Sequence, residues 1–436
     1  MNLTPDQARA LFEAGGFLII TGLPQGSSVS LDGSSNVISN FSGYKFLPPG
    51  LHLFTYFPSS SSQTSTSQVD IPPIRSAFIR VWSPRQRIII SYSPKTETIS
   101  PSTTETVILD DHLKTLDPHL AGYDFSHFPL WRLLTSEINQ RVLDNIIGSD
   151  GRVDGLTLVD GEHDDIPELA GSSRLQKGSD GEGQGSSGGE REKGEEVKEM
   201  EEVRKMNFPM FDLRRSWKDG AVGEEVTRYS MDKSWLLGNV IRRVGGDPMT
   251  LLAHFQLSFI LFLHISSYSC LVVYQRLLSL FCRSSSFFMT PEKYLIDPHT
   301  QPSPMTITTT HSPSLPSSIS SPKPSTLARQ FGLTFLSTLS AQLKTLPPDV
   351  FHTELPEMDV VYQDELAQLH ENMCDSLGRG TLWSKESHKK ELETAWGRLR
   401  DTCMRKGWSL GRLDEDEKEA EEEEEEGEYA PVVVDI

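Results

Sequence analysis

The feature that most constrains the fold is an uncharged stretch in the middle of the chain. Residues 248–275 contain no Asp, Glu, Lys or Arg, and a helix of that length is long enough to cross a bilayer. However, His254, Gln256 and His264 interrupt the stretch, and Ser266-Ser267 divides it into two segments of helical length. We therefore expect two buried core helices that turn back on each other at these serines, and no membrane span.

Most of the net charge lies in two stretches of low apolar content. The chain carries a formal charge of −20. Residues 414–428 contribute 12 acidic residues and one Lys, and residues 150–205 contribute 16 acidic and 8 basic residues. The rest of the chain is therefore close to neutral. Direct nucleic-acid binding is not expected, because it requires a concentrated Lys and Arg surface.

The first 148 residues have the pattern of a small, mostly antiparallel β domain with flanking helices. A helix is expected to begin at Pro5 and to end at Gly15-Gly16. Short runs rich in aromatic and β-branched residues predict strands. These runs are residues 17–21, 45–46, 51–57, 76–82 and 87–92. The last two are separated by four residues, which predicts a hairpin, and further helices are expected at 106–116 and 130–147.

After residue 205 the apolar period becomes helical and predicts five to seven packed helices. Together the patterns predict an α+β chain in four parts. They are a β-rich N-terminal domain (1–148), a disordered acidic linker (149–205), an all-α domain (206–410) with a Ser/Pro-rich insert (290–325), and an acidic tail that ends in a strand-forming peptide (411–436).

Signals for catalysis are weak. A metal-dependent hydrolase using His112, His119 and nearby carboxylates is the alternative function, and residues 162–165 form a second His and carboxylate cluster. No phosphate-binding loop, nucleophile elbow or dinucleotide motif is present. Four cysteines without zinc-finger spacing predict buried thiols in a reducing compartment. No signal peptide is visible. We expect that the chain is not an enzyme and binds no cofactor. We also expect it to be located in the cytoplasm and the nucleus.

Two surfaces are candidates for contact with a protein partner. Alternation in the strand 76–82 places Arg80 and Trp82 on one face, a pattern that resembles a recognition surface for a protein or for single-stranded RNA. The alternative is that both faces of that strand are covered within the fold. The C-terminal peptide is suited to adding a strand to a sheet edge, with an unstructured tail as the alternative. Its candidate contact residues are Tyr429, Val432, Val433, Val434 and Asp435. Ser303, Ser312 and Ser321 each precede a proline and are candidate phosphorylation sites.

Several segments resemble one known family, and they follow one another in the order of that family. They are residues 17–26, 45–56, 256–284 and 430–434. They are similar to the cistron-splicing-factor family of U5 snRNP assembly factors. The resemblance implies a β-rich N-terminal domain, a helical C-terminal domain and a C-terminal tail. It also implies an assembly chaperone that binds the RNase H-like and Jab1/MPN domains of the large U5 scaffold, pre-mRNA-processing factor 8, and blocks premature helicase binding.

Overall fold

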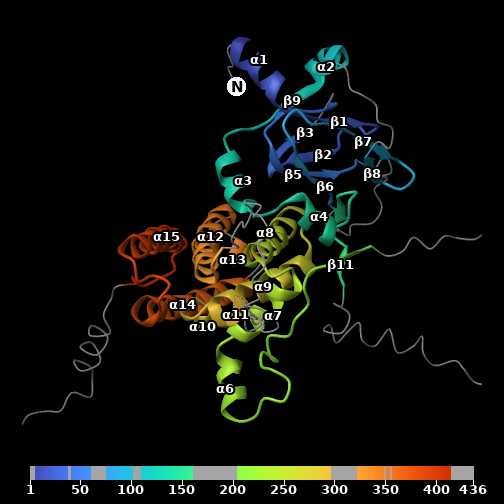
Figure 1. Cartoon of the computed structure of the whole chain (residues 1–436). Coiled ribbons are helices and arrows are strands. Elements are labelled where there is room, and N and C mark those ends of the chain that lie inside the picture. The colour runs from blue at the N-terminus through green and yellow to red at the C-terminus, as the bar shows by residue number, and fades with distance from the viewer. Residues whose placement is uncertain are drawn as a thin grey trace, which may run out of the picture. The chain divides into compact units, whose positions relative to one another are not determined.

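The computed structural model shows an α+β protein, as predicted, with a β-rich N-terminal part followed by a helical part (Figure 1). It describes residues 5–37, 41–59, 75–101, 110–160, 204–295, 322–347, 350–353 and 356–413. The chain divides into two compact units, and neither is one continuous stretch of sequence. Unit 1 comprises Met1–Phe125, Asn139–Met210 and Ile260–Val273, and unit 2 comprises Ser126–Ile138, Phe211–Phe259 and Tyr274–Ile436. Each unit is made of separate stretches of sequence, so this division does not test the four consecutive domain ranges predicted above. Those ranges stay a prediction.

Unit 1 contains two five-stranded sheets, with strand orders β8-β7-β1-β4-β9 and β10-β6-β5-β2-β3. Their strands are β1 (Gly16–Thr21), β2 (Ser28–Leu31), β3 (Ser34–Val37), β4 (Gly43–Leu47), β5 (Gly50–Phe57), β6 (Ser76–Trp82), β7 (Arg87–Ser93), β8 (Thr98–Pro101), β9 (Leu120–Gly122) and β10 (Arg152–Asp154). Neighbouring strands pair antiparallel except β1 with β7 and β4 with β9. Aromatic rings of the two sheets meet, as in Tyr44 with Phe54 at 6.2 Å.

The predicted hairpin between residues 76–82 and 87–92 is wrong, although both strands exist. Strand β6 lies in one sheet, and β7 lies in the other beside β1. The amide of Phe17 donates to the carbonyl of Gln86 at 2.9 Å, and the amide of Arg85 donates to Ala14. The turn is closed by a hydrogen bond from the amide of Gln86 to the carbonyl oxygen of Ser83 at 3.1 Å, and it is also bonded to the start of β1. Loop length alone could not reveal this long-range pairing.

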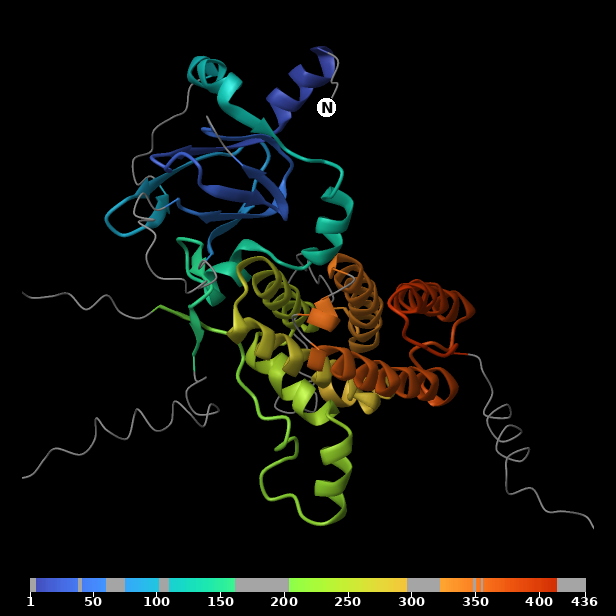
Figure 2. The same cartoon turned by 180° about the vertical axis from the view of Figure 1, so that it is seen from behind.

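Helices cover the outer face of the sheet that contains β1. Helix α1 (Pro5–Ala14) begins and ends as predicted, and α2 (Asp110–Leu116) is the described part of the helix expected at 106–116. Phe17 and Ile19 alternate with the inward side chains of β1 and form a buried cluster with Leu113. Figure 2 shows α1 and α2 on the same side of the sheets.

Part of the range predicted as a linker is folded. Residues 152–154 form β10, which pairs with β6, and β11 (Leu158–Val159) pairs parallel with β12 (Lys205–Met206). Val153 and Val159 are buried. The local apolar content is therefore sufficient for these short strands to pack, although the average apolar content of the predicted linker is low. Residues 161–203 of the predicted linker lie outside the described residues.

A buried ion pair joins the β2–β3 turn to β5. Nδ1 of His52 lies 2.6 Å from Oδ2 of Asp32, and the second ring nitrogen lies 2.7 Å from the carbonyl oxygen of Pro48. Tyr123 donates to the same carboxylate at 2.8 Å, and the amide of Leu53 donates to its other oxygen. Burial alone lowers the pKa of His52, but the charge and hydrogen bond of Asp32 outweigh it, so the pKa is raised from 6.5.

Unit 2 is helical. Its helices are α3 (Phe128–Leu134), α6 (Glu224–Met231), α7 (Ser234–Arg243), α10 (Ser285–Met289), α11 (Glu292–Leu295), α12 (Pro324–Thr345), α13 (Val350–Thr353), α14 (Pro356–Arg379) and α15 (Glu386–Arg405). The first parts of α8 (Pro248–Ile265) and the last parts of α9 (Tyr268–Cys282) also belong to it. The apolar stripes read from the sequence at 327–343, 366–377 and 392–403 lie on α12, α14 and α15.

One helix predicted from the sequence is two. The range 130–147 contains the end of α3 and then α4 (Gln140–Ile146), which belongs to unit 1. The side chain of Asn139 accepts a hydrogen bond from the amide of Val142 at 3.1 Å and caps α4. An N-cap in the middle of an apolar pattern starts a new helix, because the capped amides have no helical partner before them.

The uncharged stretch forms two helices, as predicted. Helices α8 and α9 are separated at Ser266, whose φ of 56° reverses the chain. Among the described residues, α8 is long and apolar enough to span a membrane by length and composition, and 78% of it is buried inside the protein. Its apolar side chains are therefore covered by other parts of the chain, as in a core helix.

The His52–Asp32 pair predicts a specific pH dependence of stability. Because the pKa of His52 is raised in the folded protein, the pair stabilises the fold fully below about pH 6.5 and loses this effect as the pH rises through the folded pKa. His52→Gln should cost roughly 3 kcal/mol at pH 6 and less at higher pH. Urea unfolding across this range measures the difference between the two proteins.

Because each variant is compared with wild type at the same pH, the contributions of the other histidines to the pH dependence of stability cancel. These include His254 and His264, whose pKa values burial lowers to about 4. The exposed His112→Gln is the control and should leave stability unchanged at each pH. An equal loss for His52→Gln at every pH would contradict a charged His52.

Candidate functional site

A loop in unit 2, residues 211–220, is held against the start of α7 by buried polar groups. Ser216 is fully buried and donates to the carbonyl oxygen of Tyr229. Nζ of Lys233 donates to Oγ of Ser216 at 3.0 Å and to the carbonyl oxygen of Ser230. Burial, with the nearby charge of Arg283, lowers the pKa of Lys233. This loop is therefore positioned by specific bonds rather than by chance contact.

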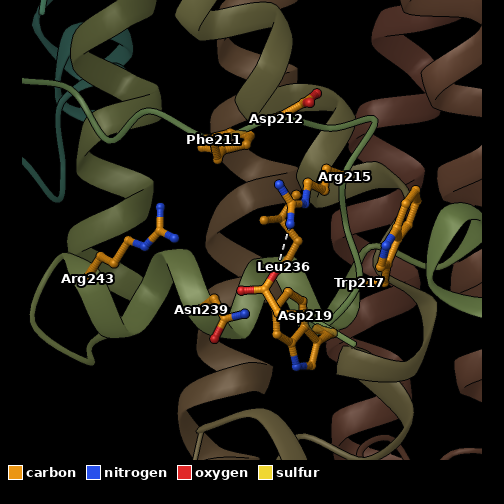
Figure 3. Close-up of a pocket in the computed structure, with 9 residues that line it drawn as sticks. Phe211, Asp212, Arg215, Trp217, Asp219, Leu236, Asn239 and Arg243 are labelled. Atoms are coloured by element: carbon orange, nitrogen blue, oxygen red, sulfur yellow. Dashed lines mark hydrogen bonds and ion pairs between the residues drawn. The ribbon is translucent and has the colours of Figure 1, made fainter. Parts of the chain in front are cut away.

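The loop and α7 line an open pocket of about 290 Å³, which we call the Trp217–Trp235 pocket after two of its lining residues (Figure 3). Its lining residues come only from these two segments. They are Phe211, Asp212, Arg215, Trp217, Asp219, Trp235, Leu236, Asn239 and Arg243. Phe211, Trp217 and Trp235 are half-buried, whereas the charged residues are exposed. The pocket thus has aromatic walls and a charged rim.

The charged rim already contains one ion pair. Arg215 donates to Oδ1 of Asp219 at 2.8 Å, and their side chains are 69% and 90% exposed. An ion pair this exposed contributes about 0–1 kcal/mol, so a carboxylate of a binding partner can replace Asp219. The described lining residues include no His, Cys or Ser. Tryptophan and arginine around a pocket are typical of a protein-binding site.

A C-terminal strap, residues 407–413, fixes the point from which the acidic tail leaves unit 2. The indole of Trp408 donates to Asp359 of α14 at 2.7 Å and stacks on Tyr362. Nε2 of His370 donates to the carbonyl oxygen of Arg412 at 2.8 Å. Trp396 of α15 donates to the carbonyl oxygen of Gly411 at 2.9 Å. The strap is therefore anchored at both of its ends.

Two other buried ionisable groups, Glu365 and His52, have structural partners. Glu365 of α14 accepts hydrogen bonds from Arg283 at 2.9–3.0 Å and from Ser279, and its side chain is 5% exposed. His52 is 0% exposed and bonded at both ring nitrogens. Glu365 and His52 therefore each have charged and polar partners within the fold.

The alternative hydrolase site finds no support in the described residues. His112 is exposed on α2, and His119 is half-buried in the short helix η1 (Asp117–His119). Within the described ranges, no group of three or more His, Cys, Asp or Glu side chains could hold a metal ion. The cluster at 162–165 lies outside those ranges.

The structure places some of the predicted contact residues and not others. Trp82 is 2% exposed and lies 5.4 Å from the ring of His52, while Arg80 is half-buried. Burial of Trp82 favours the packing interpretation of this strand. The remaining predicted residues lie outside the described residues, so their roles stay predictions. They are Tyr429, Val432, Val433, Val434, Asp435, Ser303, Ser312 and Ser321.

Comparison with known proteins decides the family. The model of the AAR2 N-terminal domain matches residues 14–148, and that of the AAR2 C-terminal repeat region matches residues 208–411. Together these matches cover well over half of the chain. The chain belongs to the AAR2 family. This confirms the resemblance to U5 snRNP assembly factors, and it supports a splicing-related role in U5 snRNP assembly.

Individual AAR2 relatives are distant in sequence. The protein AAR2 homolog of Homo sapiens is 26% identical over 303 residues, which are 66% of this chain and 74% of that protein. The homolog of Pongo abelii has the same identity and coverage. The homolog of Caenorhabditis elegans is 25% identical over 155 residues, 35% of this chain and 40% of that protein. The pocket and the strap anchors both lie within the region matched by the C-terminal AAR2 model.

The pocket was not predicted from the sequence. Phe211 and Trp217 lie in a segment without helical or strand periodicity, and Trp235 reads as part of a helical stripe. The available signal was the mixture of aromatic and basic residues in 211–218, directly after a long acidic stretch.

The strap makes a testable contribution to stability. Trp408 is buried between Tyr362 and Phe351. Trp408→Ala should therefore lower the free energy of unfolding by roughly 3–5 kcal/mol, through the cavity that it leaves. Urea denaturation followed by circular dichroism measures this, with the neighbouring exposed Ser409→Ala as the control. A loss below about 1 kcal/mol would show that the strap is not anchored by this side chain.

Proposed function

We propose that the chain is a pre-mRNA splicing factor that acts as a U5 snRNP assembly chaperone. It binds the RNase H-like and Jab1/MPN domains of pre-mRNA-processing factor 8 and blocks premature binding of the helicase. The observation that carries this proposal is the family match, which spans both the β-rich part and the helical part of the chain. A protein with this role works in both cytoplasm and nucleus and catalyses no reaction.

The proposed mechanism is steric. Both folded parts and the C-terminal peptide contact one partner, and the contact of one part raises the effective concentration of the others. The peptide 429–436 adds a strand to a sheet edge of the scaffold, where alternate valines anchor it through their side chains. The strap supports this role, because it anchors the origin of the tail to α14 and α15.

Truncation tests the contact of the tail with the scaffold. A chain ending at Glu428 keeps the acidic run and lacks the peptide. It should bind the scaffold domains at least about tenfold more weakly than the full chain, a difference of about 1.4 kcal/mol. Surface plasmon resonance with the two purified domains measures the affinity.

A second variant is the full chain with Val432→Asp and Val434→Asp, which keeps the length of the chain and the acidic run before the peptide. It should lose as much affinity as the truncation. Equal affinity of the truncated and full chains would exclude a tail contact. Absence of binding by any form would contradict the scaffold-binding function itself.

Release of the partner is proposed to depend on phosphorylation of the Ser/Pro-rich insert. Phosphate groups on Ser303, Ser312 and Ser321 would weaken docking of the acidic tail by like-charge repulsion. The triple Ser→Asp variant should bind the scaffold domains roughly 3- to 10-fold more weakly than wild type. The triple Ser→Ala variant is the control, and equal binding of both variants would eliminate this switch.

A further inference from the structure

The segments that form the Trp217–Trp235 pocket have a net positive charge. Residues 211–219 and 234–243 carry five exposed basic residues and two exposed acidic residues. The basic residues are Arg214, Arg215, Lys218, Arg242 and Arg243, and the acidic residues are Asp212 and Asp219. A peptide that matches this site carries several carboxylates close to aromatic or proline side chains, because the walls are aromatic and the segments that form them carry an excess of basic residues.

The end of this chain has that composition. Residues 414–428 have a net charge of −11, and they lead into Tyr429-Ala430-Pro431 followed by three valines. Acidic residues are thus joined directly to a tyrosine and a proline, the side chains that pack well on tryptophan. These residues lie outside the described part of the chain, so the argument rests on their sequence and on the structure of the pocket.

The tether is long enough for the tail to reach the pocket. The tail begins after Leu413, and the strap that precedes it is anchored within unit 2, which also contains the pocket. The 15 residues from 414 to 428, which precede Tyr429, can extend to roughly 50 Å. A compact unit of this size is roughly 40 Å across. The chain therefore sets no geometric limit on docking within one molecule.

We infer that the Trp217–Trp235 pocket is the resting site of the acidic C-terminal tail of the same molecule. Carboxylates of residues 421–428 replace Asp219 as the partner of Arg215, and Tyr429 and Pro431 contact the aromatic walls. Attachment through a tether of this length gives an effective concentration in the millimolar range, so a weak site is sufficient for occupancy. The tail is thereby kept from other partners until a tighter site displaces it.

This inference goes beyond the proposed function, because it concerns the chain alone and requires no scaffold protein. It has a regulatory consequence if the tail also contacts a partner. The two sites then compete for the same residues, and high salt, which screens the exposed charges of the pocket, shifts the tail towards the partner.

Hydrogen exchange on the full-length protein tests the inference. For each variant, the exchange rate of the amides is measured in a segment that contains no substitution. In the first variant, the six glutamates 421–426 are replaced by Gln, and exchange is read in residues 211–219. We expect exchange of the loop to become several-fold faster than in wild type. In the second variant, Arg215→Glu, exchange is read in residues 429–436, and it should also become several-fold faster. Both differences should disappear in high salt.

Arg379→Glu is the matched control. Arg379 is 76% exposed on α14 and forms an i,i+4 pair with Asp375, just as Arg215 does with Asp219. It should leave exchange of residues 429–436 at the wild-type rate. Circular dichroism and the melting temperature should be unchanged in all three variants, since every substituted residue is exposed or lies in the tail.

Three outcomes would overturn the inference. Wild-type exchange of the loop in the Gln variant would show that the tail does not cover the pocket. An equal effect of Arg379→Glu and Arg215→Glu would show attraction to the whole surface without a defined site. Protection that falls on dilution would assign the pocket to the tail of a second copy. None of these results depends on scaffold binding, so failure here leaves the proposed function intact.

Discussion

Burial of most of an uncharged helix is the constraint on which the helical unit depends. Helix α8 has no charged residue, so almost every side chain along it must contact other parts of the chain. Gln256, within this helix, is fully buried and fully bonded. It accepts from the amide of Glu137 at 2.9 Å and donates to Ser136 and Thr338 at 3.0 and 3.1 Å. A buried amide without these bonds would be costly, so this one residue specifies which segments surround the helix.

Buried ion pairs have a comparable role at other positions. The pair His52–Asp32 joins two segments of unit 1, and Arg283–Glu365 joins α9 to α14 in unit 2. A charge cannot be left buried without its partner. These pairs therefore restrict how the segments can be arranged, even where their net contribution to stability is small.

The distribution of charge separates folding from binding along this chain. The two strongly acidic stretches account for nearly all of the net charge, and their longest parts lie outside the described residues. The folded remainder is close to neutral overall, yet it presents a local excess of basic residues around the Trp217–Trp235 pocket. A nearly neutral folded part beside a highly acidic tail makes the tail the strongest electrostatic ligand that the chain itself contains.

The sequence by itself determined the elements whose signals are local. Pro5 marks the start of α1, the serines at 266–267 mark the division between α8 and α9, and four-residue apolar spacing marks α12, α14 and α15. The order of the family motifs also determined the family. Only the tertiary structure decided that β7 pairs with β1 instead of β6, and that Trp217 and Trp235 line one pocket. These features depend on contacts between segments far apart in the chain, and such contacts leave no periodic pattern in either segment.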